Sequence, residues 1–152
     1  MKIAKGKTIE PRLYRKILAL MPIPCVDAVV VYRRNFLLAK RKNKPAKGKW
    51  WLIGGRILKG ESLKQALLRK VREETGLHVK VRRLLTARET LFKESAQGPS
   101  SHTINTVFLV KSSGKRELSP DSQSSELKWF SKINRRWPKY VKEMLTLAGF
   151  KH

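Results

Sequence analysis

One glycine-bounded helix constrains this chain more than any other feature. The stretch from position 54 to position 77 reads GGRILKGESLKQALLRKVREETGL. Ser62, followed three residues later by Gln65, is a capping-box start, and Gly76 after a charged last turn is a helix stop. The sequence therefore predicts a helix over Leu63–Thr75.

This helix carries an acidic residue on its apolar side. At 100° per residue, Glu74 falls on the same broad side as the apolar residues of the helix, which are Leu63, Leu67, Leu68 and Val71. A carboxylate placed there must be desolvated, and it faces the negative end of the helix dipole. It therefore needs a cation, for which Arg69, Lys70 and a bound metal ion are the candidates. The alternative is an ordinary amphipathic helix with pairs from Arg69 to Glu73 and from Lys70 to Glu74, each worth a few tenths of a kcal/mol.

The spacing of the charged residues and glycines resembles the signature box of the Nudix hydrolases. The matching positions are Gly55, Glu61, Arg69, Val71, Glu73, Glu74, Gly76 and Leu77. In that family the box forms a loop-helix-loop whose glutamates hold magnesium or manganese against a diphosphate, while the arginine orients them. One specified position departs, because Lys70 stands where the family pattern has glutamate.

The departure at Lys70 changes the local charge by two units. At about 6 Å and an effective dielectric of about 20, each pair of unit charges is worth on the order of 3 kcal/mol. Additional metal ions near Lys70 are therefore disfavoured. We expect one Mg²⁺ or Mn²⁺ ion, held by Glu74 and a backbone carbonyl at Gly54 or Gly55, with Glu73 as a further candidate ligand.

Composition bounds the remaining choices. A length of 152 residues with 41% hydrophobic content predicts one globular domain over 1–152, with a flexible basic tail over 1–8. The single cysteine, Cys25, excludes a disulfide within the chain and favours a reducing compartment. Because no secretory signal or membrane span is evident, we expect a cytoplasmic protein without a membrane partner.

The charge balance is strongly basic. Thirty-five Lys and Arg against eleven Asp and Glu give a net charge of +24, which attracts polyanions in general and favours anionic small molecules as substrates. A nucleic-acid partner stays open but is not favoured, because the sequence shows no zinc-finger spacing, RNP motif or basic zipper.

Hydrophobic periodicity along the chain alternates between strand and helix patterns. Strands are expected over 25–32, 36–41, 50–53, 79–90, 102–110 and 126–130, and helices over 11–21, 63–75 and 134–150. This order predicts an α/β fold in which the box helix packs on a mixed sheet. With the box, the resemblance implies a Nudix-type α/β/α sandwich.

Segments flanking the box narrow the resemblance to one subgroup. The segment FLLAKRKNKPAKGKWWLIGGR, the VD pair in the first strand and a histidine opening a later strand are similar to GDP-mannose mannosyl hydrolases. That subgroup also departs from the box at the position of Lys70. Its members cleave the sugar from a nucleoside diphosphate by attack at the anomeric carbon, whereas most of the family attacks phosphorus. Related enzymes are commonly dimers, so a homodimer is a further option.

The resemblance implies a role for each matching residue. Glu74 and the Gly54 carbonyl would bind the metal, Arg41 and Arg56 would neutralise the diphosphate, and Arg69 would organise the site. Asp27 would contact the nucleotide, and His102 would be the general base, since a histidine near its ordinary pKa accepts a proton at neutral pH. Glu73 is present where the mannosyl hydrolases do not require an acid, which favours the general diphosphatases.

Two functions follow as hypotheses. The first is Mg²⁺-dependent hydrolysis of a nucleoside diphosphate derivative, in particular a nucleotide sugar such as GDP-mannose. In the second, Lys70 pairs with Glu74 and silences the site, which leaves a Nudix-fold module that binds RNA, DNA or nucleotides through its basic surface.

Overall fold

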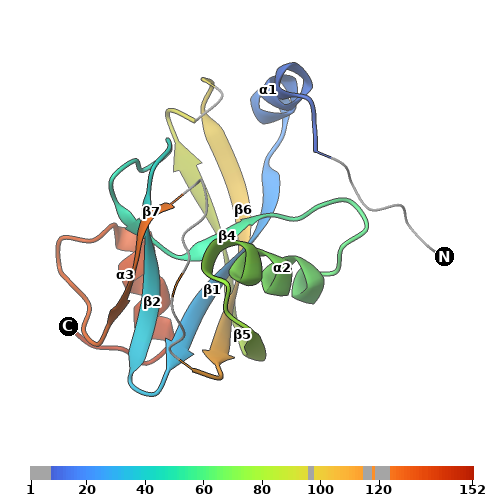
Figure 1. Cartoon of the computed structure of the whole chain (residues 1–152). Coiled ribbons are helices and arrows are strands. Elements are labelled where there is room, and N and C mark those ends of the chain that lie inside the picture. The colour runs from blue at the N-terminus through green and yellow to red at the C-terminus, as the bar shows by residue number, and fades with distance from the viewer. Residues whose placement is uncertain (1–7, 96–97, 115–117, 119–123) are drawn as a thin grey trace.

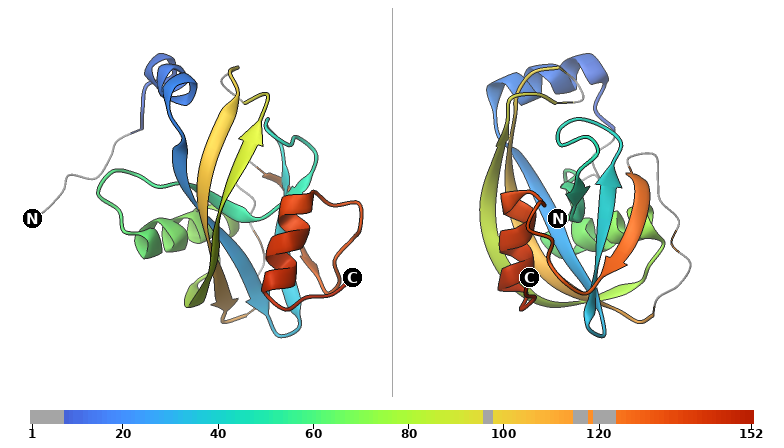
Figure 2. Two further views of the ribbon diagram at one scale, coloured as in Figure 1. Left: turned by 180° about the vertical axis from the view of Figure 1, so that it is seen from behind. Right: turned by 90° about the vertical axis from the view of Figure 1, so that its left-hand side faces the viewer.

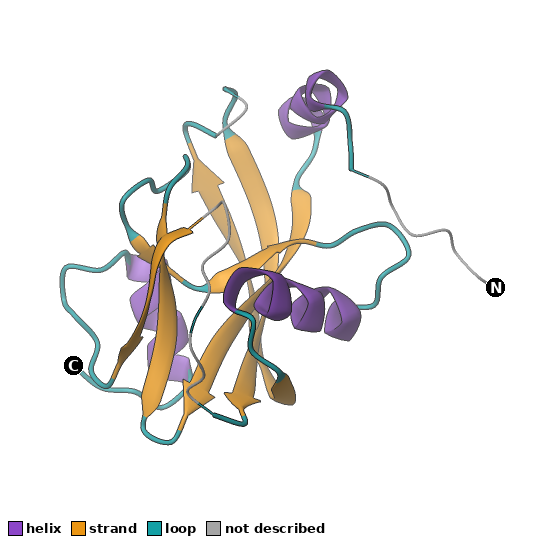
Figure 3. Cartoon of the chain, viewed as in Figure 1, coloured by secondary structure: helices purple, strands orange, loops and turns teal. Residues whose placement is uncertain are grey.

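The computed structural model of the chain describes residues 8–95, 98–114, 118 and 124–152. The predicted basic tail, 1–8, lies outside the described residues except at its last position. In chain order the elements are α1 (Pro11–Leu20), β1 (Ile23–Tyr32), β2 (Asn35–Arg41), β3 (Trp50–Trp51), β4 (Ile53–Arg56), α2 (Leu63–Thr75), β5 (Val79–Phe92), β6 (Ser101–Ser112), β7 (Ser124–Phe130) and α3 (Lys139–Leu147) (Figures 1 and 3).

The strands form one mixed sheet around β1. The sheet order is β3-β2-β1-β6-β5, with β4 paired to β1 and β7 paired to β2. Strand β1 runs antiparallel to β2 and β4 and parallel to β6. Because β4 leads directly into the loop before α2, its pairing with β1 fixes where the box begins relative to the centre of the sheet.

Alternate side chains of β1 enter two separate cores. Val26, Ala28 and Val30 pack in the cluster that contains the buried face of α2, whereas Val29 packs in the cluster that contains α3. Successive side chains of a strand point to opposite faces, so the two helices cover opposite faces of the sheet, as the two views in Figure 2 show. The predicted Nudix-type α/β/α sandwich is thereby confirmed.

Several boundaries shift by one or two residues, and the larger departures from the sequence prediction are at the strand 50–53 and at the terminal helix. The predicted strand 50–53 is divided into β3, which pairs with β2, and β4, which pairs with β1. The terminal helix begins at Lys139 rather than at 134, because Pro138 occupies the N-cap position with an extended backbone and disfavours helical geometry in the residue before it. The helix ends before Gly149, whose φ is +97°.

Helix α1 covers one end of β1. Leu18 packs with Ile23 and Cys25 in a third, smaller cluster, and Figure 1 shows this helix at the end of the sheet remote from the β1–β2 turn. Helices long and apolar enough to cross a membrane do not occur among the described residues.

Candidate active site

The box helix α2 is capped at both ends by its own sequence. The Ser62 side chain accepts a hydrogen bond from the Gln65 amide, and the Gln65 side chain accepts one from the Ser62 amide. At the other end Gly76 adopts the left-handed conformation, with φ of +73°. These caps satisfy backbone donors and acceptors that a helix terminus leaves unpaired, and they confirm the predicted bounds of the helix.

The last turn of α2 holds a buried ion pair. The Lys70 ammonium lies 2.9 Å from Glu74 Oε1, and the two side chains are only 9% and 6% exposed. The same ammonium lies 3.6 Å from Glu73, whose side chain is half exposed. Of the two side-chain cations that the sequence offered to Glu74, Lys70 is therefore the one that forms an ion pair with it.

Gly55 makes room for this ion pair. A Cβ at that position would lie 2.7 Å from Lys70 Cε, and φ of +158° further restricts other residues. The aliphatic part of Lys70 therefore rests against the glycine turn, and its ammonium is directed to the acids of α2.

Arg69 fastens the loop before the helix. Its Nε and one NH₂ group bind the two oxygens of Glu61 at 2.5 and 2.8 Å, and the NH₂ group also donates to the Arg56 carbonyl at 3.1 Å. Glu61 in turn accepts a hydrogen bond from the Leu58 amide. The contact with Glu73 is longer, at 3.2 Å. Arg69 therefore holds the end of β4 and the following loop against α2, and its role in organising a catalytic site stays a prediction.

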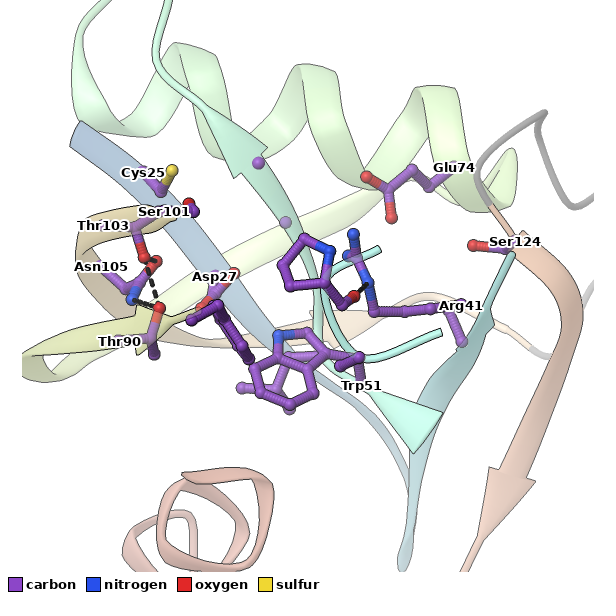
Figure 4. A pocket seen from close by; sticks show the side chains of 17 residues that line it. Cys25, Asp27, Arg41, Trp51, Glu74, Thr90, Ser101, Thr103, Asn105 and Ser124 are labelled. Carbon is purple, nitrogen blue, oxygen red and sulfur yellow. Dashed lines mark hydrogen bonds between the residues drawn. The ribbon is translucent and has the colours of Figure 1, made fainter. Parts of the chain in front are cut away.

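A narrow cavity of about 180 Å³ opens beside the glycine turn (Figure 4). Its lining combines predicted site residues with aromatic and hydroxyl groups, in particular Asp27, Arg41, Gly54, Gly55, Glu74, Trp51, Phe92, Thr90, Ser101, Thr103 and Asn105. We refer to it as the narrow cavity. The chain thus leaves space next to Glu74 although the carboxylate is paired with Lys70.

Asp27 is the buried acid of this cavity. The Tyr140 hydroxyl donates to its Oδ2 at 2.6 Å, and burial raises the pKa of Asp27 to about 6. Its Oδ1 lies against Gly54, where a Cβ would come within 2.1 Å of that oxygen. The hydrogen-bond partner of this acid is therefore a tyrosine from α3.

Arg41 projects into the narrow cavity from the end of β2 (Figure 4). Its Nε donates to the Pro45 carbonyl at 2.6 Å, which fixes the direction of the guanidinium. Burial lowers the pKa of Arg41 from its ordinary value, while the charges of Glu74 and Asp27 oppose that shift. The guanidinium thereby adds positive charge to a cavity that contains two acids.

A second, wide cavity of about 670 Å³ adjoins the first. The two share Arg41, Pro45, Gly55 and Ser101, and the wide cavity is further lined by Arg56, Arg69, Lys70, Glu73, Lys44, Asn43, Ser95, Leu58 and five residues from the N-terminal segment, Thr8, Ile9, Pro11, Tyr14 and Leu18. Glu74 lines only the narrow cavity and Lys70 only the wide one. Their ion pair therefore lies where the two cavities meet.

The structure does not bring His102 to either cavity. Ser101, Thr103 and Asn105 line the narrow cavity, and alternation along a strand turns His102 to the opposite face of the sheet. On that face its strand neighbour is Leu91, which is 72% exposed. The proposed general base is thus separated from Glu74 and Arg41, so its role stays a prediction to which this geometry lends no support.

Sequence reasoning missed one wall of the narrow cavity. Thr90 and Thr103 share a hydrogen bond of 2.5 Å, and the Asn105 side chain bonds to both threonines. Trp51 lies in contact with Phe92, with ring centroids 5.6 Å apart, and stacks on Tyr140 at 5.5 Å. The alternating polar residues of β6 could have indicated this wall. The contact between Thr90 and Thr103, however, depends on the pairing of β5 with β6, which the sequence does not show.

The donor set determines whether a metal ion fits. Carboxylate and carbonyl oxygens suit Mg²⁺, which commonly takes one or two carboxylates and completes its shell with water and phosphate. Glu74 and the glycine turn supply such oxygens to the narrow cavity, whereas Glu73 lines the wide one. Within the described ranges, no group of three or more His, Cys, Asp and Glu side chains could hold a metal by itself. The residues fit a single ion whose coordination is completed by substrate oxygens. For that ion to bind, the Lys70 ammonium must move away from the Glu74 carboxylate.

Comparison with known proteins agrees with this geometry. The NUDIX domain model matches residues 21–134, which is most of the chain, and the protein therefore belongs to the Nudix family. It is 35% identical over 129 residues to the ADP-ribose pyrophosphatase of Methanocaldococcus jannaschii, a match that covers 84% of this chain and 73% of that protein. It is also 35% identical over 119 residues to the low-salt glycan biosynthesis protein Agl8 of Haloferax volcanii, covering 77% and 76% of the two chains.

The fold has solved counterparts. The crystal structure of a MutT NUDIX hydrolase from Burkholderia pseudomallei aligns with a TM-score of 0.68 and 26% identity, covering 84% of this chain and 98% of that one. Helix α1 and helix α3 lie outside the residues that the family model matches. Tyr14 of α1 lines the wide cavity, and Tyr140 of α3 binds Asp27, which lines the narrow one.

Proposed function

We propose that this protein hydrolyses a nucleoside diphosphate linked to a sugar, with Mg²⁺ or Mn²⁺ as the cofactor. One observation carries the proposal: a single cavity joins Glu74, the glycine turn and Arg41 to a wall of aromatic and hydroxyl groups. The charged groups and the glycine turn suit a diphosphate, and the aromatic and hydroxyl wall suits a nucleoside. GDP-mannose and ADP-ribose are the first candidate substrates, the former from the subgroup resemblance and the latter from the name of the Methanocaldococcus relative.

The charged residues of the site would have different roles toward the diphosphate. Arg41 and Arg56 would neutralise it, because planar guanidinium groups bind phosphate oxygens in pairs. A metal ion held by Glu74 and the Gly54 carbonyl would supply further neutralisation of the leaving group. Arg69 keeps the glycine turn and the loop after it in place through Glu61.

The nucleoside would occupy the other side of the narrow cavity. Trp51 and Phe92 offer aromatic surface for a base, for which stacking is worth about 1–3 kcal/mol. Asn105 and the threonine pair offer hydrogen-bonding groups to its edge. A Trp51→Ala variant should therefore weaken binding of the nucleotide product more than binding of inorganic pyrophosphate, which isothermal titration calorimetry measures.

The position of His102 bears on the mechanism. In the mannosyl hydrolases water attacks the anomeric carbon, and His102 was the candidate for the general base of that step. His102 lies on the face of the sheet opposite to the narrow cavity. We therefore favour attack at phosphorus. Turnover in oxygen-18 water should place the label in a phosphate, whereas label in the sugar would contradict this preference.

A substrate screen tests the whole proposal. The protein should cleave GDP-mannose or ADP-ribose in the presence of Mg²⁺ or Mn²⁺ and neither after treatment with a chelator. Glu74→Gln should abolish the turnover, while Glu126→Gln, which changes an exposed carboxylate on β7 by the same charge, should preserve it. If no diphosphate in the screen gives metal-dependent turnover, the proposal is wrong.

The buried ion pair favours a second candidate function. Because the Lys70 ammonium already neutralises Glu74, the domain could bind nucleotides or nucleic acid without catalysis, assisted by its net charge of +24. In that case Lys70→Glu would create activity in an inactive protein. If the proposed hydrolase function holds, the same substitution changes a rate that the wild-type protein already has. Salt-dependent binding of RNA together with no affinity for Mg²⁺ would support the second function.

A further inference from the structure

Helix α1 presents a row of apolar side chains to solvent. Leu13 and Leu20 are 53% and 83% exposed, and Met21, the residue that caps the end of the helix, is 55% exposed. The two leucines are seven residues apart, which is about two helical turns, so they lie on the same side of α1. Of the eight large apolar side chains that are most exposed in the described part of the chain, the other five are divided among α2, β5, β6 and α3. Exposed apolar surface is therefore concentrated at α1.

A different side of α1 attaches the helix to the sheet. Leu18 is buried with Ile23 and Cys25, and Tyr14 packs against the same cluster. This inward side lies about a third of a turn around the helix from the two leucines. The exposed row is therefore not what holds α1 at the end of the sheet, where Figures 1 and 2 show it.

The charged residues of α1 are all cations. Arg12, Arg15 and Lys16 are exposed, and they take part in none of the salt bridges among the described residues. They follow the leucine row on the side that faces away from β1. The neighbouring acid, Glu10, is engaged as the helix cap, where its carboxylate accepts hydrogen bonds from the amides of Arg12 and Leu13. The outward side of α1 thus combines exposed leucines with positive charges that have no carboxylate partner in the described structure.

An apolar groove of about 320 Å³ adjoins the end of the leucine row. Met21 borders the groove, whose other apolar lining residues include Ile9, Ile17, Pro22, Ile57 and Leu58. Its charged lining residues are the cations Arg56 and Lys59. The groove therefore continues the exposed apolar surface from α1 to the loop after β4, and the charge around it is again positive.

We infer that the outward side of α1 and the adjoining groove bind the surface of an anionic lipid bilayer. The leucines and Met21 enter the boundary between headgroups and acyl chains, and the three cations of α1 contact lipid phosphates. An amphipathic helix with a cationic side and exposed leucines lies in the plane of such a surface, and each Lys or Arg near an anionic leaflet strengthens the binding. We expected no membrane partner because the sequence shows no secretory signal or membrane span, but this kind of attachment requires neither.

The combination of charge and apolar exposure favours lipid over two other partners. A second copy of this chain would bring together two molecules that each carry a net charge of +24, and α1 has no acidic residue to pair with the cations of its copy. RNA or DNA would pair with the cations through its phosphates, but it would offer Leu13 and Leu20 no apolar contact along its backbone. A bilayer with anionic headgroups supplies both kinds of contact.

Sedimentation with lipid vesicles tests the inference without substrate or metal. At physiological ionic strength, the wild-type protein should bind vesicles of phosphatidylcholine and phosphatidylglycerol at least about tenfold more tightly than vesicles of phosphatidylcholine alone. Leu13→Gln combined with Leu20→Gln should weaken this binding at least about fivefold, because leucines no longer leave water. Leu84→Gln combined with Leu147→Gln, which replaces exposed leucines on β5 and α3, should change it much less. A wild-type protein that does not bind the mixed vesicles, or equal losses in the two double variants, would overturn the inference.

A second pair of variants separates the cations of α1 from the net charge of the chain. Arg12→Gln combined with Lys16→Gln should weaken binding to the mixed vesicles by about 30-fold. Lys132→Gln combined with Arg136→Gln removes the same charge from exposed positions between β7 and α3, and it should weaken binding by less than about threefold. Equal losses in these two variants would show that net charge alone attracts the vesicles, which contradicts a lipid surface at α1.

A fluorescent label reports whether α1 enters the bilayer. The single cysteine of the chain, Cys25, is buried, so Leu20→Cys can be labelled selectively with a dye that is sensitive to its surroundings. Its emission should increase and shift to the blue on mixed vesicles but not on RNA, and the same dye at Leu147→Cys should do neither. An equal response to RNA would assign this side of α1 to nucleic acid, and self-association that the Leu13→Gln and Leu20→Gln pair abolishes would assign it to a second copy; either result would overturn the inference.

Discussion

The Lys70–Glu74 ion pair predicts an unusual dependence of metal affinity on one lysine. If Glu74 is to hold Mg²⁺ or Mn²⁺, the ammonium 2.9 Å from its Oε1 must move away. Separating a hydrogen bond between charged groups costs about 1.5–3 kcal/mol, and every 1.4 kcal/mol is about tenfold in affinity. Replacing Lys70 by methionine, which keeps the length of the chain without its charge, should therefore tighten metal binding by about 10- to 150-fold.

Titration with Mn²⁺ followed by electron paramagnetic resonance gives the affinity directly, without a substrate. Lys64→Met is the matched control, because Lys64 is exposed on the same helix and its loss removes the same formal charge. The control should shift the affinity by less than about threefold, since exposed charges are screened at physiological ionic strength. A Lys70→Met protein that is folded but binds Mn²⁺ no more tightly than the wild type would refute the competition between ammonium and metal.

The same substitution should lower the stability of the metal-free protein. Removing one partner of a buried ion pair leaves the other charge uncompensated, at about 3–5 kcal/mol when water is excluded. Glu74 borders the narrow cavity, so solvent reduces this cost, and we expect a loss of about 1–3 kcal/mol in the free energy of unfolding by urea. Added Mn²⁺ should restore stability to Lys70→Met more than to the wild type, because a ligand stabilises the fold in proportion to its affinity.

Three further predictions follow from the local geometry. The pKa of Asp27, raised to about 6 from 3.8, means that the folded state binds the proton more tightly. This contribution to stability is present below pH 4 and is lost as pH rises through about 6, so in metal-free urea unfolding the stability of the wild type relative to Asp27→Asn should fall by about 3 kcal/mol from pH 4 to pH 7, and a pH-independent difference would contradict the raised pKa. Gly54→Ala should cost about 3 kcal/mol or more in thermal unfolding, since its Cβ would meet Asp27 Oδ1 at 2.1 Å and the Val26 carbonyl at 2.3 Å, and a variant with wild-type stability would contradict that clash. Ser62→Ala should lose about 1 kcal/mol of stability in the same assay through loss of the helix cap, and an unchanged melting temperature would count against it.

The sequence predictions were correct where neighbouring residues determine the structure, and they failed where residues far apart in the sequence determine it. The bounds of α2 were correct, because Ser62, Gln65 and Gly76 act within one turn of the helix. The division of the predicted strand 50–53 was missed, because a strand that passes from one partner to another leaves no local signal. Tyr140 was likewise placed on an amphipathic helix, but its hydrogen bond to Asp27 spans 113 positions of sequence.

The alternation rule also explains how the site differs from the resemblance. His102 was taken as the general base from its position in the resemblance, at the opening of a strand, and a histidine near its ordinary pKa suits that role. The pairing of β6 with β5 shows that Ser101, Thr103 and Asn105 occupy the cavity side instead. A strand presents a new residue to a given face only at every second position, so the face that His102 occupies depends on the register of β6, which the sequence alone did not supply.

The glycine at position 55 and the lysine at position 70 are physically coupled. With any side chain at position 55, a Cβ would approach Lys70 Cε to 2.7 Å, so the lysine could lie in its present place only by shifting the glycine turn. A turn that shifts would also move Gly54, which packs against the buried acid Asp27. The glycine pair therefore leaves space for the Lys70 stem on one side and, under the proposed function, would give a metal ion access to a backbone carbonyl on the other. Gly55→Ala should consequently release Lys70 from Glu74, and in a double-mutant cycle with Lys70→Met the two effects on Mn²⁺ affinity should be non-additive by at least about 1 kcal/mol; strictly additive effects would show that the turn and the lysine act independently.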